Sequence, residues 1–247
     1  MHRVLTALFM LAAPALAAEP ALRFSVVESW SMPLVLVENG ETRAGLLYDL
    51  MSSLARQVGM PAQFIVLPRK RVQTAMENGQ VDVRCYAAQS WLPNLSGDYI
   101  WSLPLMRQRD ILVARAGDVR AVDLGQLRDE RIGTILGFMY RGLDERFASG
   151  ALIRDDARNQ NQVLRKLLAG RYRYAASNDL TVNWLNLQLP ADQRIHEVAL
   201  IQDMNLGCYV RNDPALPVQR ILRTLLRMKM SGEVDGLVSK YKVVQGP

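Results

Sequence analysis

The chain has 247 residues, with 30 lysines and arginines against 24 aspartates and glutamates, which gives a formal net charge of +6. The basic residues are scattered and form no stripe with interleaved aromatic residues, which argues against a nucleic-acid-binding protein. Beyond the N-terminal apolar run, no segment is long and apolar enough to cross a bilayer. The length suffices for one large domain or for two small lobes with separate cores.

The first residues have the pattern of a secretory signal peptide. Met1-His2-Arg3 is a short basic segment, Val4–Leu16 is an apolar run, and Ala15-Leu16-Ala17 fits the small-x-small cleavage rule. We expect cleavage after this triplet or one residue later, and therefore a signal peptide over residues 1–17. A buried N-terminal helix is the competing interpretation. Because no cysteine lies near the cleavage site, we expect a periplasmic protein without a lipid anchor.

Strands and helices alternate in the first part of the mature chain. Leu47, Leu50 and Leu54 recur at helical spacing, and Gly59 is a suitable C-cap for that helix. Asn39-Gly40 is typical of a tight hairpin turn. The predicted elements are a strand over 22–27, short strands over 34–37 and 44–46, a helix over 47–58, a strand over 63–67, a helix over 68–79 and a strand over 81–86.

The same alternation starts again in the middle of the chain. Val163, Leu164 and Leu167 lie on one face of a clear amphipathic helix. Strands that alternate with helices predict the α/β class with a mostly parallel sheet, here in two blocks. The predicted elements are strands over 111–114, 131–136, 172–176, 195–200 and 206–210, helices over 140–147, 161–169, 180–187 and 218–230, and helical turns over 123–127 and 237–241.

Short motifs along nearly the whole mature chain carry a resemblance to a known family. Each motif is weak alone, but their order and spacing behind a signal peptide are specific. They resemble those of type II periplasmic solute-binding proteins, of the family-3 or polar amino acid type that serves ABC importers. The motifs are Asn39-Gly40 with Gly45 and Asp49-Leu50, Gly79–Asp82, Tyr99–Pro104, Gly133 with Gly137, Ala169–Arg171, Ser231–Asp235 and Lys240-Tyr241.

The resemblance implies a two-lobed fold in which the chain crosses to the second lobe and then returns. Lobe 1 would be discontinuous, with residues 18–106 and 204–247, and lobe 2 would hold residues 107–203. Two crossing strands, near Leu105–Gln108 and Leu200–Asn205, would form the hinge. The lobes would close over a small solute by hinge motion.

Cys85 and Cys208 are the two cysteines of the chain. In an oxidising compartment an even number of cysteines favours a disulfide. The resemblance places their strands side by side in lobe 1, so we expect a bridge between them. Two buried free thiols are the alternative.

The resemblance also implies where a solute would bind. Ligand-facing residues of this family lie in loops at the carboxyl ends of strands, at the mouth between the lobes. The expected ligand-binding residues are Glu28 and Trp30 after the first strand, Arg69 at a helix start, Tyr86, Ala87, Gln89 and Trp91 after the third strand, and Phe138, Met139, Tyr140, Asn178 and Asp179 in lobe 2.

Two departures from the family pattern bear on the ligand. Asn94 stands where amino-acid-binding members have the arginine that grips the α-carboxylate, and Asn178 stands where they have an aspartate for the α-amino group, although Asp179 follows it. Arg69 stands where the family often has a stacking aromatic residue. Its guanidinium could stack on a ligand and bind a carboxylate, or Arg69 could be a surface residue. We expect a polar, carboxylate-bearing solute rather than an α-amino acid held in the usual way.

The resulting expectation is a monomeric solute-binding protein without a cofactor, a metal or catalytic activity, which delivers its solute to an ABC permease. A fold-related, dehydratase-like periplasmic enzyme is one alternative, with Glu28 or Asp179 as the acid. A sensor that docks on a receptor is another. His196 is the single histidine of the mature chain, so we expect neither a Ser-His-Asp triad nor a set of metal ligands.

Overall fold

The computed structural model describes residues 20–92 and 96–242. The expected signal peptide, residues 1–17, and Asn94 lie outside the described residues, and both stay predictions. Within the described ranges, no helix combines the length and the apolar composition that crossing a membrane requires.

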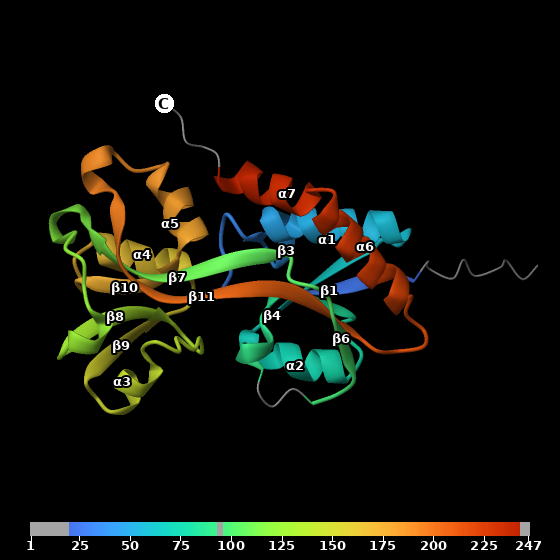
Figure 1. Ribbon diagram of the computed structural model, residues 1–247, viewed down its shortest axis with the longest axis horizontal. Coiled ribbons are helices and arrows are strands. Elements are labelled where there is room, and N and C mark those ends of the chain that lie inside the picture. Colours follow the sequence, from blue (N-terminus) through green and yellow to red (C-terminus); the bar gives the residue numbers. More distant parts are fainter. Residues whose placement is uncertain (1–19, 93–95, 243–247) are drawn as a thin grey trace, which may run out of the picture.

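The first lobe is built on parallel strands with helices on both faces. Its elements are β1 (Leu22–Val27), β2 (Leu36–Glu38), β3 (Glu41–Ala44), α1 (Leu46–Val58), β4 (Ala62–Leu67), α2 (Arg69–Glu77), β5 (Val83–Ala87), the short helix Gln89–Trp91, β6 (Tyr99–Trp101) and, near the C-terminus, α6 (Val218–Met230) and α7 (Glu233–Lys242). β1 lies between β4 and β5 and pairs in parallel with both. Helices α1, α6 and α7 lie over one face of this sheet, and α2 lies on the other (Figure 1).

The second lobe repeats the arrangement. Its elements are the short helices Ala116–Asp118, Leu124–Gln126 and Ala191–Gln193, with β8 (Glu130–Ile135), α3 (Asp144–Ala148), β9 (Leu152–Ala157), α4 (Gln160–Leu168), β10 (Tyr174–Asn178) and α5 (Asp179–Asn186). β8 pairs in parallel with both β9 and β10. The sequence pattern did not predict β9, because Arg154-Asp155-Asp156 has the polarity of a loop. The structure buries Asp155 and compensates its charge with Lys166 and Arg171, at 2.8 and 3.2 Å.

Two antiparallel strands, β7 (Met106–Arg115) and β11 (Ile195–Arg211), connect the lobes. The separate strands predicted over 195–200 and 206–210 are therefore wrong in one respect, since they form one continuous strand. The last part of β11 pairs with β5 and β6 of the first lobe. Together the strands form a nine-stranded sheet that runs through both lobes. The predicted lobe boundaries at 106/107 and 203/204 fall within β7 and β11.

The C-terminal helices return to the first lobe and are tied to its first helix. Lys240 Nζ lies 2.7 Å from an Asp49 carboxylate oxygen, and the Tyr241 hydroxyl donates to the same oxygen at 3.0 Å. A disulfide joins Cys85 of β5 to Cys208 of β11, which confirms the expected bridge. These links hold chain segments that are far apart in sequence in one folded unit.

Candidate functional site

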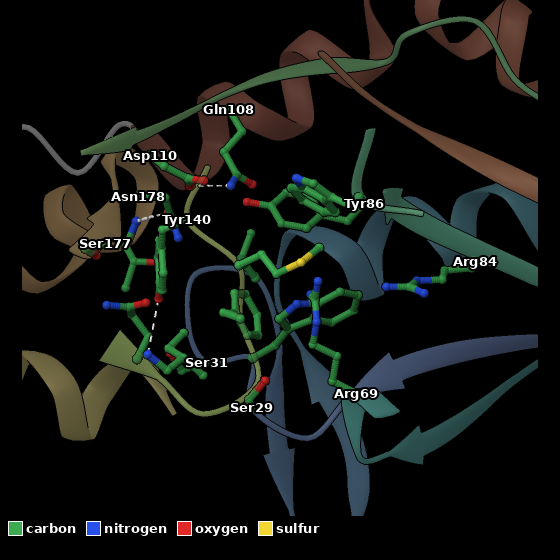
Figure 2. Close-up of a pocket in the computed structure, with 18 residues that line it drawn as sticks. Ser29, Ser31, Arg69, Arg84, Tyr86, Gln108, Asp110, Tyr140, Ser177 and Asn178 are labelled. Carbon is green, nitrogen blue, oxygen red and sulfur yellow. Dashed lines mark hydrogen bonds between the residues drawn. The ribbon is translucent and has the colours of Figure 1, made fainter. Parts of the chain in front are cut away.

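A cavity lies between the two lobes, beside the crossing strand β7 (Figure 2). Its volume is about 40 Å³, which is room for about three water molecules. A molecule held there would contact both lobes and the hinge. The lining residues are Ser29, Trp30, Ser31, Leu34, Arg69, Arg84, Tyr86 and Trp91 of the first lobe, Gln108 and Asp110 of β7, and Ile135, Phe138, Met139, Tyr140, Gln160, Ser177, Asn178 and Thr181 of the second lobe.

Arg69 is the first residue of α2 and reaches across to the second lobe. Its guanidinium carbon lies 4.4 Å from the centre of the Phe138 ring and 5.9 Å from that of Trp91. Burial, and secondly the charge of Arg84, lower the pKa of Arg69 to about 10. Among the described residues, no carboxylate lies within salt-bridge distance of Arg69. A helix start is also an unfavourable place for a cation, because the helix dipole is positive there.

Arg84 is the second residue of β5 and is only 3% exposed. One of its terminal nitrogens donates to the Tyr209 hydroxyl at 3.3 Å. Its Nε atom has no hydrogen-bond partner, and no acid pairs with its charge, within the ranges that the structure describes. A buried charge is costly unless it is paired. We call Arg69 and Arg84 the arginine pair. Because no acid compensates their charges among the described residues, they favour the binding of an anion.

Asp110 of β7 is the single acidic residue among the described residues that line the cavity. It is 8% exposed and accepts hydrogen bonds from the side-chain amides of Gln108 and Gln202, the latter at 2.6 Å. Burial raises the pKa of Asp110, while the hydrogen bonds from Gln202 and Gln108 favour its ionised form. With the arginine pair and an ionised Asp110, the lining carries one net positive charge.

Four buried hydroxyl groups line the same cavity, and we call them the cavity hydroxyls: those of Ser29, Ser31, Tyr86 and Ser177. None of them has a hydrogen-bond partner among the described residues, and neither does the carbonyl oxygen of the Gln108 side chain. Buried polar atoms in native proteins are nearly always hydrogen-bonded. Their convergence on one cavity provides hydrogen-bonding groups for a polar ligand or for ordered water.

The backbone at the end of β5 aims Tyr86 into this space. Tyr86 has a φ of 59°, in the left-handed region that a non-glycine residue rarely adopts. Its ring meets Trp30 edge-on, with 5.8 Å between the ring centres. Burial raises the pKa of Tyr86 well above its ordinary value, so the hydroxyl stays protonated and can donate. Backbone strain of this kind is concentrated at ligand-binding and catalytic sites.

The second lobe offers fixed polar groups opposite the arginine pair. The amide N–H of Ile135 donates to the Tyr140 hydroxyl at 3.1 Å, which fixes the ring and leaves the O–H of Tyr140 to donate elsewhere. The side-chain oxygen of Asn178 accepts the N–H of Thr181 at 2.9 Å and thereby caps α5. The amide nitrogen of Asn178 is therefore its group that can donate to a ligand.

The structure brings together most of the residues expected to bind the ligand. Glu28 is exposed, Asp179 begins α5 outside the cavity, and Ala87 and Gln89 line a separate surface groove. These four residues therefore have no place in the lining of the interlobe cavity. The expected residues that do line it are Trp30, Arg69, Tyr86, Trp91, Phe138, Met139, Tyr140 and Asn178.

Arg84, Asp110 and the serine hydroxyl groups were not predicted from the sequence. A signal for Arg84 exists in the sequence, since it is the one charged residue inside the apolar run Val83–Ala87. Asp110 lies on β7 between the crossing expected near Leu105–Gln108 and the strand predicted over 111–114, so neither prediction included it. No group of three or more histidine, cysteine or acidic side chains gathers at metal-binding distance in the described ranges.

No protein-family model matches the chain, and no curated protein sequence matches it. Solved structures of similar fold are an ancestral arginine-binding protein bound to arginine (19% identity, 90% of this chain and 97% of that chain, TM-score 0.72) and the GluR0 ligand-binding core in complex with L-glutamate (12%, 91% and 99%, TM-score 0.74). A third is the amino acid ABC transporter substrate-binding protein AbpA from Streptococcus pneumoniae, bound to L-arginine (14%, 90% and 94%, TM-score 0.72). The chain therefore has the two-lobed fold of type II periplasmic binding proteins, and at the level of the fold the resemblance stated from the sequence is confirmed.

Proposed function

We propose that this chain is a periplasmic solute-binding protein that captures a small, polar, carboxylate-bearing solute between its lobes and delivers it to an ABC importer. The observation that carries the proposal is the unmatched chemistry of the interlobe cavity. The arginine pair supplies two positive charges, of which that of Arg84 is buried and that of Arg69 is partly buried, and the cavity hydroxyls supply donors and acceptors. A carboxylate satisfies both, because guanidinium groups bind it through two parallel hydrogen bonds.

Binding and closure are the same event in this proposal. Lobe 1 holds the carboxylate through the arginine pair, and lobe 2 adds Tyr140, Ser177 and Asn178. A ligand that contacts both lobes only in the closed form shifts the population toward that form. The closed form is then the state that a permease recognises, and the protein acts as a monomer without catalysis.

Two features of the structure support closure by bending of the crossing strands. The pairing of β7 with β11 shifts register between Glu197 and Ala199 and again between Leu200 and Gln202. Such irregularities bend a strand locally. Across the cleft, Arg141 of the second lobe donates to the Ser90 carbonyl, and the Arg69 guanidinium lies over Phe138.

The proteins of similar fold support a binding role, since their ligands are arginine and L-glutamate. All of these ligands carry a carboxylate. AbpA, the ABC transporter substrate-binding protein among them, also supports delivery to an importer.

Thermal melting of residues 18–247 against amino acids, opines, polyamines, dicarboxylates, small hydroxy acids, aromatic acids and sugars tests the proposal. A ligand at about 1,000 times its Kd adds about 4 kcal/mol of stability. We expect a shift with a carboxylate-bearing compound and no turnover of it. Turnover would indicate the enzyme alternative, and the lack of any shift would contradict solute binding.

A matched pair of variants locates the binding site. Arg69→Ala should abolish binding while the protein stays folded, because it removes half of the arginine pair. Arg71→Ala is the control, since Arg71 lies on the same helix and is exposed. Equal affinities of the two variants in calorimetry would rule out Arg69 as the anchor.

A further inference from the structure

The charge of the cavity restricts the class of solute. The arginine pair contributes two positive charges and Asp110 one negative charge, so the lining residues carry a net charge of +1. The two amide donors on Asp110 favour its ionised form. A monoanion neutralises this lining. A zwitterion leaves one buried positive charge uncompensated, and a dianion leaves one negative charge, and both are costly in a buried site.

The polar groups of the cavity offer no separate place for an ammonium group. Asn178 is neutral, and its oxygen is used to cap α5. Asp179 lies outside the lining. Asp110 already accepts Gln108 on one carboxylate oxygen and Gln202 on the other. A ligand ammonium would have to compete with both amides for that carboxylate.

The same groups favour a hydroxyl beside the carboxylate. The side-chain oxygen of Gln108 is a pure acceptor, and it has no partner among the described residues. The cavity hydroxyls can donate or accept. A ligand hydroxyl can donate to Gln108 and accept from a serine, whereas a ketone oxygen can only accept.

The volume sets the size of the solute. About 40 Å³ is room for about three water molecules, because a cavity needs about 10–15 Å³ to hold each one. A molecule that replaces them has about two or three carbon atoms with its oxygens, on that scale. Amino acids with side chains as long as those of arginine or glutamate need a larger volume than this.

We propose that the solute is a small monoanionic 2-hydroxy acid of the size of glycolate or lactate, with no ammonium group. The inference rests on the proposed function and names the ligand class of that same site. The carboxylate lies against the arginine pair, and the 2-hydroxyl lies between Gln108 and the cavity hydroxyls. The aromatic rings of Trp30 and Phe138 cover the small apolar remainder.

Calorimetric titration with compounds of one size tests the proposal. Glycolate and both enantiomers of lactate are compared with alanine, which has an ammonium in place of the hydroxyl, with pyruvate, which has a ketone, and with malonate, which is a dianion. We expect glycolate or one lactate enantiomer to bind at least tenfold more tightly than alanine and malonate, and more tightly than pyruvate. Equal or tighter binding of alanine or malonate would overturn the proposal.

The outcome separates this inference from the proposed function. If a larger solute of the melting panel binds and the hydroxy acids do not, the inference fails and the proposed function stands. If nothing binds, both fail.

A second variant tests the charge argument through a ratio of affinities, which a partial folding defect does not change. Asp110→Asn raises the charge of the lining from +1 to +2. The preference for lactate over malonate should then shift toward malonate by at least about fivefold, a change of about 1 kcal/mol. An unchanged ratio would show that Asp110 does not set the charge of the solute.

Discussion

Asp82, just before β5, and Arg84, within β5, are both buried charges, but their surroundings differ. Asp82, just before β5, has a side chain that is 1% exposed, and it is held by Arg23 at 2.6 Å and by Arg211 at 3.0 Å. Arg84, two residues further on, is also buried but has only a tyrosine hydroxyl at 3.3 Å. The first charge is compensated by the protein itself, and the second faces the interlobe cavity.

The difference separates groups that hold the fold from groups that await a ligand. A compensated buried charge is destabilising to remove, because its partners are left behind. A buried charge without a counter-ion lowers the stability of the empty protein and is retained where binding needs it. Asp82 and Arg84 should therefore respond to substitution with opposite signs.

The largest effect on stability is expected at Asp82, the buried charge that the protein itself compensates. Asp82→Ala leaves Arg23 and Arg211 without their carboxylate and should reduce the free energy of unfolding by about 3 kcal/mol. Denaturant unfolding measures this loss. Asp235→Ala is the control, since it breaks the exposed ion pair with Lys229 and should cost less than about 1 kcal/mol. Similar losses of unfolding free energy in the two variants would contradict a special stabilising role for the buried, compensated charge.

Arg84→Met should leave stability intact and reduce ligand affinity. The substitution removes an uncompensated buried charge but keeps the volume, so stability should stay the same or rise, while affinity falls by about 100-fold or more. Arg173→Met is the control, because Arg173 also lies over an aromatic ring, that of Tyr174, outside the cavity. A destabilised Arg84→Met variant that still binds would make Arg84 a structural residue.

A smaller effect is expected from the pH dependence of Asp110. Burial raises the pKa of Asp110 in the folded protein above the ordinary value of 3.8. The Asp110 carboxyl group therefore binds a proton more tightly in the folded state than in the unfolded state. Its contribution to the free energy of unfolding is fully present below pH 3.8 and is lost as the pH rises through the pKa of the folded state.

Asp110→Asn removes this pH dependence. The stability of the variant relative to the native protein should rise as the pH increases across that interval and then level off. Unfolding measured between pH 3 and pH 8 checks the trend. If the stability of the variant relative to the native protein fell over the same interval, the charge of Asp110 would be stabilising in the folded protein, which would contradict the prediction.

The smallest effect is expected at a contact that holds the lobes together without lining the cavity. Arg141→Ala removes the hydrogen bond to the Ser90 carbonyl and should weaken binding about two- to fivefold, the effect of one exposed hydrogen bond. Because the closed form is destabilised, the dissociation rate should increase and the association rate should change little. Stopped-flow kinetics would contradict this if the association rate alone changed.

Much of the fold could be predicted because its strands are buried and its helices are amphipathic. The exceptions have physical reasons. Residues 201–205 join two predicted strands into β11, but β11 is partly solvent-exposed between the lobes, so no apolar pattern marks it. The helix predicted over 140–147 begins only at Asp144, because residues before it turn Tyr140 toward the cavity.

The site could be predicted only in part. Motif spacing placed Arg69 and the aromatic residues beside the cavity. Arg84 and Asp110 were missed because a single charged residue inside a strand has no meaning until its neighbours are known. Whether a buried charge has a partner depends on contacts such as that of Gln202 with Asp110, which lie far apart in sequence.

The most direct test of the account is thermal melting of the native protein and of Arg84→Met, each with and without the carboxylates of the panel at saturating concentration. The account predicts a ligand-induced increase in Tm for the native protein, and little or no increase for the variant, whose Tm without ligand equals or exceeds that of the native protein. Equal ligand-induced shifts in the two proteins, or a variant that melts several degrees lower without ligand, would contradict the claim that the cavity carries a buried charge reserved for an anion.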